Sequence, residues 1–141
     1  MRRSVGLALV ALLALAAAGC SSDNSSATTP STPAPGPGTD TFTATLAPKG
    51  TAIHSFEASA TGTVNVTLTT TSPPSMLVGL GIGVPGANIG GCDLTKTVQT
   101  VAGNTAQLTA AVESGSYCTG AFDVGTVGPT GVLVTISVAH P

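Results

Sequence analysis

From residue 41 onward, apolar and polar residues alternate with a period of two, the pattern of strands that are buried on one face only. The clearest case is residues 63–69, where Val64, Val66 and Leu68 alternate with threonines and an asparagine. Similar segments, with turn residues between them, are 41–47, 52–57, 76–84, 106–112, 116–124 and 132–139. About seven or eight short strands of this kind predict an all-β fold, an antiparallel two-sheet sandwich.

One of these segments, residues 76–84, has glycine at the positions opposite its apolar face: Gly79, Gly81 and Gly83. Glycine in a strand predicts close approach of another backbone or a strong bend. Residues 81–86 also match the pattern G-x-G-x-x-G, but dinucleotide binding needs a helix that starts there. Pro85 and the residues after it predict a loop instead.

The first forty residues predict export rather than a fold. Residues 1–19 combine two arginines with an uncharged apolar run, as in a signal peptide, and the run is shorter than the roughly 20 residues that span a membrane. Residues 15–20 resemble the lipobox of bacterial lipoproteins, which implies that Cys20 is acylated and becomes the first residue of the mature chain. The alternative is an ordinary secretory signal in which Cys20 has no role.

Residues 20–40 form, by this prediction, a lipidated cysteine followed by a flexible linker rich in Ser, Thr and Pro, and residues 41–141 form the domain. The expected location is the cell envelope, on the extracytoplasmic side, with the membrane as a partner through the N-terminal lipid. No Asp directly follows Cys20, which favours the outer membrane in an organism that has one.

Apart from Cys20, the cysteines are Cys92 and Cys118, the even number expected for one disulfide in an oxidising compartment. Two buried free cysteines, or two metal ligands, are the alternatives. A zinc site needs about four ligands, and only His54 and His140 are available to join them. A metal site is therefore the weaker interpretation.

Charge excludes one class of function. Without the signal peptide the chain keeps two lysines and six acidic residues, a side-chain net charge of −4. Nucleic-acid binding draws most of its affinity from lysines and arginines that neutralise phosphates. We therefore expect no nucleic-acid partner.

The C-terminal half resembles a known family in its run Gly115-Ser116-Tyr117-Cys118, its run 122–125 and a final strand that ends in residues 138–141. These segments, with the earlier strands in the same order, resemble the bacterial pre-peptidase C-terminal domain across residues 41–141. The resemblance implies a jelly-roll-like β-sandwich that is usually accessory to a secreted enzyme and is sometimes matrix-binding or stabilised by calcium.

No residues form a recognisable catalytic group, and no cofactor is expected. His54 lies near Ser55 and Glu57, but the chain has neither a nucleophile-elbow serine nor a zinc-protease helix. A satisfied or exposed strand histidine is the simpler interpretation. The chain is therefore expected to be a non-catalytic binding or structural module whose partner is an envelope protein or a glycan. The alternative is an accessory domain or small hydrolase that acts with a secreted peptidase.

The expected contact surface is the loop at residues 84–95, which is long, rich in glycine and polar, with Asn88 and Asp93 as contact residues. Asp93 and Asp123 are also weak candidates for a calcium site completed by loop carbonyls. The alternative is that both are solvated acids that form turns. No other metal ligand is expected.

Overall fold

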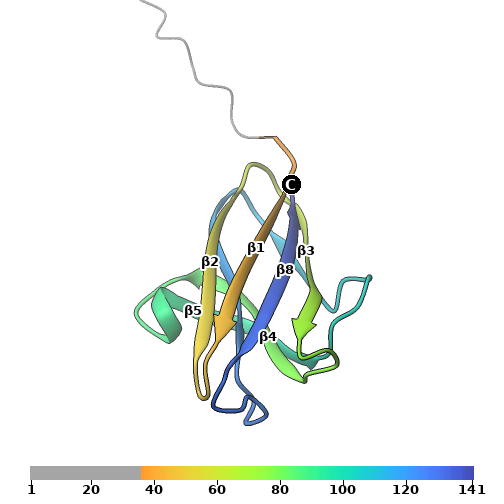
Figure 1. Ribbon diagram of the computed structural model, residues 1–141. Helices are drawn as coiled ribbons and strands as arrows, with labels where there is room; N and C mark the ends of the chain where they lie inside the picture. The colour runs from red at the N-terminus through yellow and green to blue at the C-terminus, as the bar shows by residue number, and fades with distance from the viewer. Residues whose placement is uncertain (1–35) are drawn as a thin grey trace, which may run out of the picture. The chain divides into compact units, whose positions relative to one another are not determined.

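The structure, a computed structural model, describes residues 36–141 and consists there of eight β-strands in two antiparallel sheets of four (Figure 1). The strands are β1 (Gly38–Leu46), β2 (Thr51–Ala58), β3 (Gly62–Ser72), β4 (Val78–Pro85), β5 (Cys92–Thr100), β6 (Leu108–Val112), β7 (Gly115–Phe122) and β8 (Val132–His140). One 3-10 turn, η1 (Ile89–Gly91), lies between β4 and β5. The expectations for the signal peptide, for lipidation of Cys20 and for most of the linker concern residues outside this range.

The strand order is β1-β8-β3-β6 in one sheet and β2-β7-β4-β5 in the other. Every connection along the chain crosses from one sheet to the other except the hairpin between β4 and β5. This is the order of a jelly roll, so the expected two-sheet sandwich with jelly-roll-like topology is confirmed. Within residues 36–141 there is no helix of the length and apolar character that crossing a bilayer requires.

Two features differ from the sequence prediction. Strand β1 begins at Gly38, so the last residues of the expected linker already belong to a sheet. Strand β5 was not expected as a strand at all. It lies at the edge of its sheet and has few apolar residues, chiefly Leu94 and Val98, so its alternation is too weak to recognise from sequence.

The core lies between the sheets and is made almost entirely of aliphatic side chains, as the composition requires. Phe56 is its one buried aromatic residue within the described range. The largest side chains that are completely enclosed are Leu46, Leu68, Leu80, Ile82 and Ile136, with valines from β3, β4 and β8 around them. The period-two pattern therefore identified the inward face of these strands correctly.

The glycines of β4 and β7 leave room for neighbouring backbone and side-chain atoms to pack closely on the outer face of the sheet β2-β7-β4-β5. A Cβ at Gly83 would lie 1.9 Å from the carbonyl oxygen of Asp93, and one at Gly120 would lie 2.2 Å from that of Ala52. The register between β4 and β5 also shifts between Ile82 and Gly83. The expected close backbone approach is therefore present at Gly83.

At the other two glycines of β4 the close neighbour is a side chain. The ring of Phe122 occupies the space beside Gly79, and Leu94 occupies the space beside Gly81. Both side chains are only partly buried. The outer face of β4 is thus covered by a thin apolar layer that glycine makes room for.

At each of the two sides of the sandwich, a polar contact joins the edge strand of one sheet to the edge strand of the other. On one side, the edge strands β1 and β2 are joined by Asp40 and His54, whose Oδ2 and Nε2 atoms lie 3.2 Å apart. On the other side, Lys96 of β5 donates a hydrogen bond from Nζ to the carbonyl oxygen of Thr109 in β6. These contacts link edges that share no backbone ladder.

Replacing Gly120 with Ala tests the close approach between β7 and β2. Because the added methyl group would collide with backbone, which cannot rotate away, we expect the free energy of unfolding to fall by about 3 kcal/mol. Gly128→Ala is the matched control, since nothing lies within 4 Å of a Cβ there. Denaturant unfolding measures both variants, and equal stability of the two would contradict the packing described.

Candidate functional site

The loop proposed as the contact surface is shorter than the sequence predicted. Val84 and Pro85 pair with Asp93 and Cys92 at the end of the ladder between β4 and β5, which leaves only residues 86–91 as the connection. The expected boundaries, 84–95, are therefore wrong. The reason is again that the polar edge strand β5 has the composition of a loop.

Backbone hydrogen bonds fold this connection tightly. The Gly86 N–H donates to the carbonyl oxygen of Gly91, and the Gly91 N–H donates to that of Asn88, both with N···O distances of 3.0 Å. Gly90 and Gly91 have φ angles of +61° and +90°, a region that side chains other than glycine rarely adopt. The glycines that made this segment read as a loop in the sequence are thus required by a defined turn.

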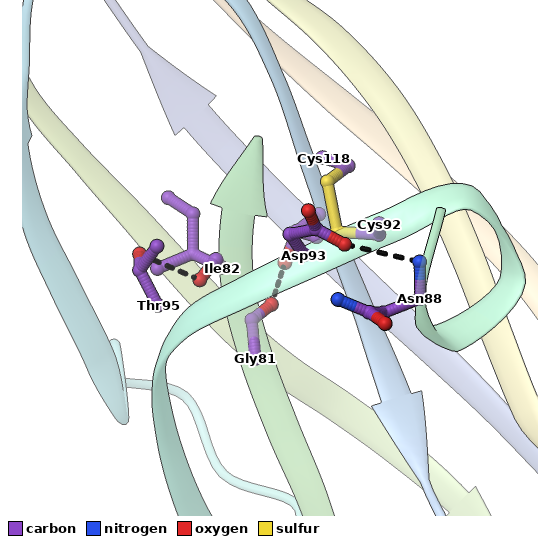
Figure 2. The surroundings of a disulfide bond; sticks show 8 residues. Gly81, Ile82, Asn88, Cys92, Asp93, Thr95 and Cys118 are labelled. Atoms are coloured by element: carbon purple, nitrogen blue, oxygen red, sulfur yellow. Dashed lines mark hydrogen bonds between the residues drawn. A yellow bond between two sulfur atoms is a disulfide. The ribbon is translucent and has the colours of Figure 1, made fainter. Parts of the chain in front are cut away.

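The two candidate contact residues have different roles in this turn. Asp93 lies at the start of β5, and its Oδ1 accepts a hydrogen bond from the Asn88 N–H at 3.0 Å (Figure 2). A Cβ at Gly86 would lie within 2.3 Å of both Asp93 carboxylate oxygens, so this carboxylate fills the space that Gly86 leaves. Asp93 therefore holds the loop in shape, whereas the Asn88 side chain is exposed and available to a partner.

Cys92 and Cys118 are bonded to each other, with an S–S distance of 1.98 Å and Cα atoms 5.9 Å apart, so the predicted disulfide is confirmed. The bond joins β5 to β7, the two strands that pair with β4 on its opposite edges, and both cysteines are fully buried (Figure 2). By the chain-entropy model, closing a loop of 26 residues contributes about 3.5 kcal/mol of stability. It also fixes the C-terminal end of the 86–91 loop to the sheet.

Two apolar side chains of this part of the chain are exposed. Val84 at the end of β4 and Ile89 in the loop are each 43% exposed. The loop is also held against β2, since a Cβ at Gly90 would lie 3.0 Å from Cγ1 of Ile53. The loop therefore offers a partner the Ile89 side chain and the Asn88 amide, and it is held by a covalent bond and a turn.

Asp123, the other candidate calcium ligand, is occupied by backbone donors. Its Oδ2 accepts the Lys49 N–H at 2.8 Å, and its Oδ1 accepts the N–H groups of Val127, Gly125 and Thr126 at 2.7–3.0 Å. These bonds, that of Lys49 above all, lower the pKa of the Asp123 carboxyl, because each favours the ionised form.

Asp123 thus joins the turn after β7 to the turn between β1 and β2. This is the turn-forming role that was the alternative to calcium binding. Asp93 makes its hydrogen bond to a different segment, the 86–91 loop. Within residues 36–141 no group of three His, Cys, Asp or Glu side chains is placed so that it could hold a metal ion.

The structure also brings together three polar side chains that sequence reasoning did not connect: Asp40 of β1, His54 of β2 and His140 of β8. Asp40 Oδ2 lies 3.2 Å from His54 Nε2 and 3.8 Å from His140 Nε2. Each of the three lies two residues from an apolar residue, namely Phe42, Phe56 and Val138 respectively. Because residues two apart in a strand share a face, this spacing could have placed all three on the inward faces of their strands.

No protein-family model, curated protein or solved structure matches this chain. The loop, its disulfide and the arrangement of polar side chains therefore carry the functional argument.

Replacing Asp123 with Asn tests its structural role through pH. The pKa of Asp123 is lower in the folded chain than in the unfolded chain, where it is about 3.9, so its ionised form stabilises the fold above that value. This contribution is lost as pH falls through the folded pKa. We expect Asp123→Asn to lower the melting temperature at pH 7 and the difference from wild type to shrink below about pH 4.

The control for this prediction is Glu113→Gln, which removes an exposed carboxylate on another turn. Thermal melts at pH 7, 4 and 2.5 make the comparison. A difference between Asp123→Asn and wild type that stays constant over this range would contradict the assigned role.

Proposed function

We propose that this protein is a non-catalytic binding module of the cell envelope, anchored by lipid at Cys20 and displayed on the extracytoplasmic side by the linker. The observation that carries the proposal is the 86–91 loop, an exposed recognition surface whose end is fixed by a disulfide. A loop ordered in advance loses less conformational entropy when a partner binds, so more of the contact energy becomes affinity.

Three features support an envelope location. The lipobox-like residues 15–20 and the signal-like residues before them predict export and acylation. The disulfide is a bond that persists in oxidising compartments and is rare in the cytosol. The lipobox resemblance implies a diacylated Cys20, and two acyl chains attach a protein stably where one chain alone holds it only reversibly.

The histidine environment supports a binding role rather than catalysis. The Nε2 of His54 is hydrogen-bonded to the Asp40 carboxylate and not to a hydroxyl or thiol that it would activate. The buried hydroxyl of Thr119, on the inward face of β7, donates its proton to the carbonyl oxygen of Gly81 at 2.7 Å.

The expected partner is an envelope protein or a glycan. The exposed 86–91 loop combines the apolar Ile89 side chain with the Asn88 amide and contains no charged residue. An accessory role beside a secreted peptidase is the second candidate, and the jelly-roll strand order supports it, because that is the fold implied by the resemblance to pre-peptidase C-terminal domains.

Lipid anchoring is tested by growing the source cells with an alkyne analogue of palmitate. The wild-type chain is expected to incorporate the label and to partition into the detergent phase, because acylated Cys20 carries the chains. The Cys20→Ser variant is expected to do neither. An unlabelled wild-type protein would show that the N-terminus is an ordinary secretory signal.

The binding surface is tested with Asn88→Ala, which leaves the turn intact because Asn88 contributes to it only through its backbone. We expect this change to reduce retention of the lipid-free protein on a delipidated envelope fraction by at least fivefold. Asn104→Ala is the matched control, an exposed asparagine in the loop between β5 and β6. Equal retention of the two variants would show that the loop is only a connection.

A further inference from the structure

We propose that an open cavity at the end of β3 binds one neutral pyranose unit of a glycan. The cavity has a volume of about 260 Å³, and its lining residues are Thr69, Thr70, Thr71, Pro74, Ser75 and Ala102. None of them belongs to the 86–91 loop, so this site is separate from the contact surface there.

The cavity lies where β3 extends past its neighbour β6. Strand β3 continues to Ser72, whereas its ladder with β6 ends at Val66. The chain between β5 and β6 lies along the next part of this edge, where the Gly103 N–H donates to the carbonyl oxygen of Leu68 at 2.9 Å (Figure 1). Beyond Leu68, β3 therefore borders the cavity, whose other walls are the turn after β3 and the segment after β5.

A β-bulge turns a threonine toward the interior at this end of the strand. The register between β3 and β8 shifts between Leu68 and Thr70, so the buried positions of β3 change from even-numbered to odd-numbered residues. Thr71 is buried as a result, whereas Thr70 is exposed. The inward face of β3 is therefore apolar up to Leu68 and carries a hydroxyl group at the cavity.

The Thr71 hydroxyl is the observation that points to a ligand. The residue is only 8% exposed, and its Oγ1 has no hydrogen-bond partner within the part of the chain that the structure describes. A buried polar group without a partner is costly. One rotamer step about χ1 redirects a threonine hydroxyl, so a ligand hydroxyl in the cavity can become its partner.

The other lining groups match a sugar in kind. Thr70 and Ser75 carry hydroxyls on exposed residues, and each hydroxyl can both donate and accept a hydrogen bond. The Thr69 hydroxyl donates to a carbonyl oxygen of β8 at 3.0 Å, so its oxygen remains an acceptor. Pro74 and Ala102 add carbon surface. A pyranose has the complementary pattern, with hydroxyls at the edge of its ring and C–H groups on its faces.

Charge and size exclude other classes of ligand. No lining residue is charged, so a phosphate or carboxylate would enter without a cation to pair with it. A hydrocarbon would leave the hydroxyls without partners. The volume of about 260 Å³ is far above the about 10–15 Å³ that one water molecule needs and just below the roughly 300 Å³ at which pockets for drug-sized ligands begin. A single sugar ring fits this range, and the rest of a glycan would extend into solvent.

The test titrates the full chain, held in a detergent without sugar groups, with D-glucose, D-mannose or N-acetyl-D-glucosamine alone. The amide NMR signals of Thr70, Thr71 and Ala102 are expected to shift in a saturable way with at least one of these sugars. The signals of Asn88 and Ile89 are expected not to move. Glycerol, which has hydroxyls but no ring face, is expected to bind at least tenfold more weakly.

Two variants remove hydroxyls from the cavity, and each is expected to weaken sugar binding at least fivefold. Thr71→Val keeps the shape of the side chain, and the fold is expected to keep its stability because the lost hydroxyl has no partner. Ser75→Gly is compatible with the turn, since glycine readily adopts the φ angle of +62° found there. Thr63→Val is the matched control, an exposed threonine at the other end of β3, and is expected to bind as wild type does.

The absence of a saturable shift with all three sugars would overturn the proposal, as would equal sugar affinity of Thr71→Val and the wild type. If a variant does not fold, the wild-type titrations with the sugars and with glycerol decide the question alone. Asn88→Ala is expected to bind sugar as the wild type does. Failure of this site and failure of the 86–91 loop are therefore separate results.

Discussion

The bond between Cys92 and Cys118 compensates for a strand that is weak by itself. Strand β4 has glycine at three of its eight positions, and each glycine costs about 0.5–1 kcal/mol relative to alanine because it loses more backbone freedom on folding. The total of about 1.5–3 kcal/mol is smaller than the roughly 3.5 kcal/mol attributed to the disulfide, so the bond more than offsets it. By joining the strands on both edges of β4, the bond holds them against a strand that has few side chains of its own to pack.

This arrangement also explains why the outer face of the second sheet is unusual. In most sandwiches the outer positions carry polar side chains that face water. Here Phe122 and Leu94 lie over glycines instead, so β4 is covered on both faces, and the fully buried disulfide belongs to that outer layer. This layer also holds the 86–91 loop in place, because the last residue of the loop directly precedes the disulfide-bonded Cys92.

Much of the fold could be predicted from sequence because alternation is a local signal. Residues 63–69 and 132–139 have strong alternation, and they became the central strands β3 and β8. The disulfide followed from counting the cysteines. Strand β5 could not be found in the same way, because an edge strand buries few side chains and has no need of an apolar face.

The cluster of Asp40, His54 and His140 could not be predicted for a different reason. Its members are up to 100 residues apart in sequence and meet only because β1 pairs with β8 and lies beside β2. Which strands are neighbours is a property of topology, and no local pattern encodes it. Sequence could show that a histidine takes an inward position, but not which carboxylate faces it.

The edge position of β1 determines where the domain begins to open. Gly38, the first residue of β1, pairs with His140, and β1 has a hydrogen-bonded neighbour on one edge only. Fraying can therefore start at this end of β1 without breaking any other strand pair. The contact between Asp40 and His54 joins the same end of β1 to β2, so it opposes this fraying.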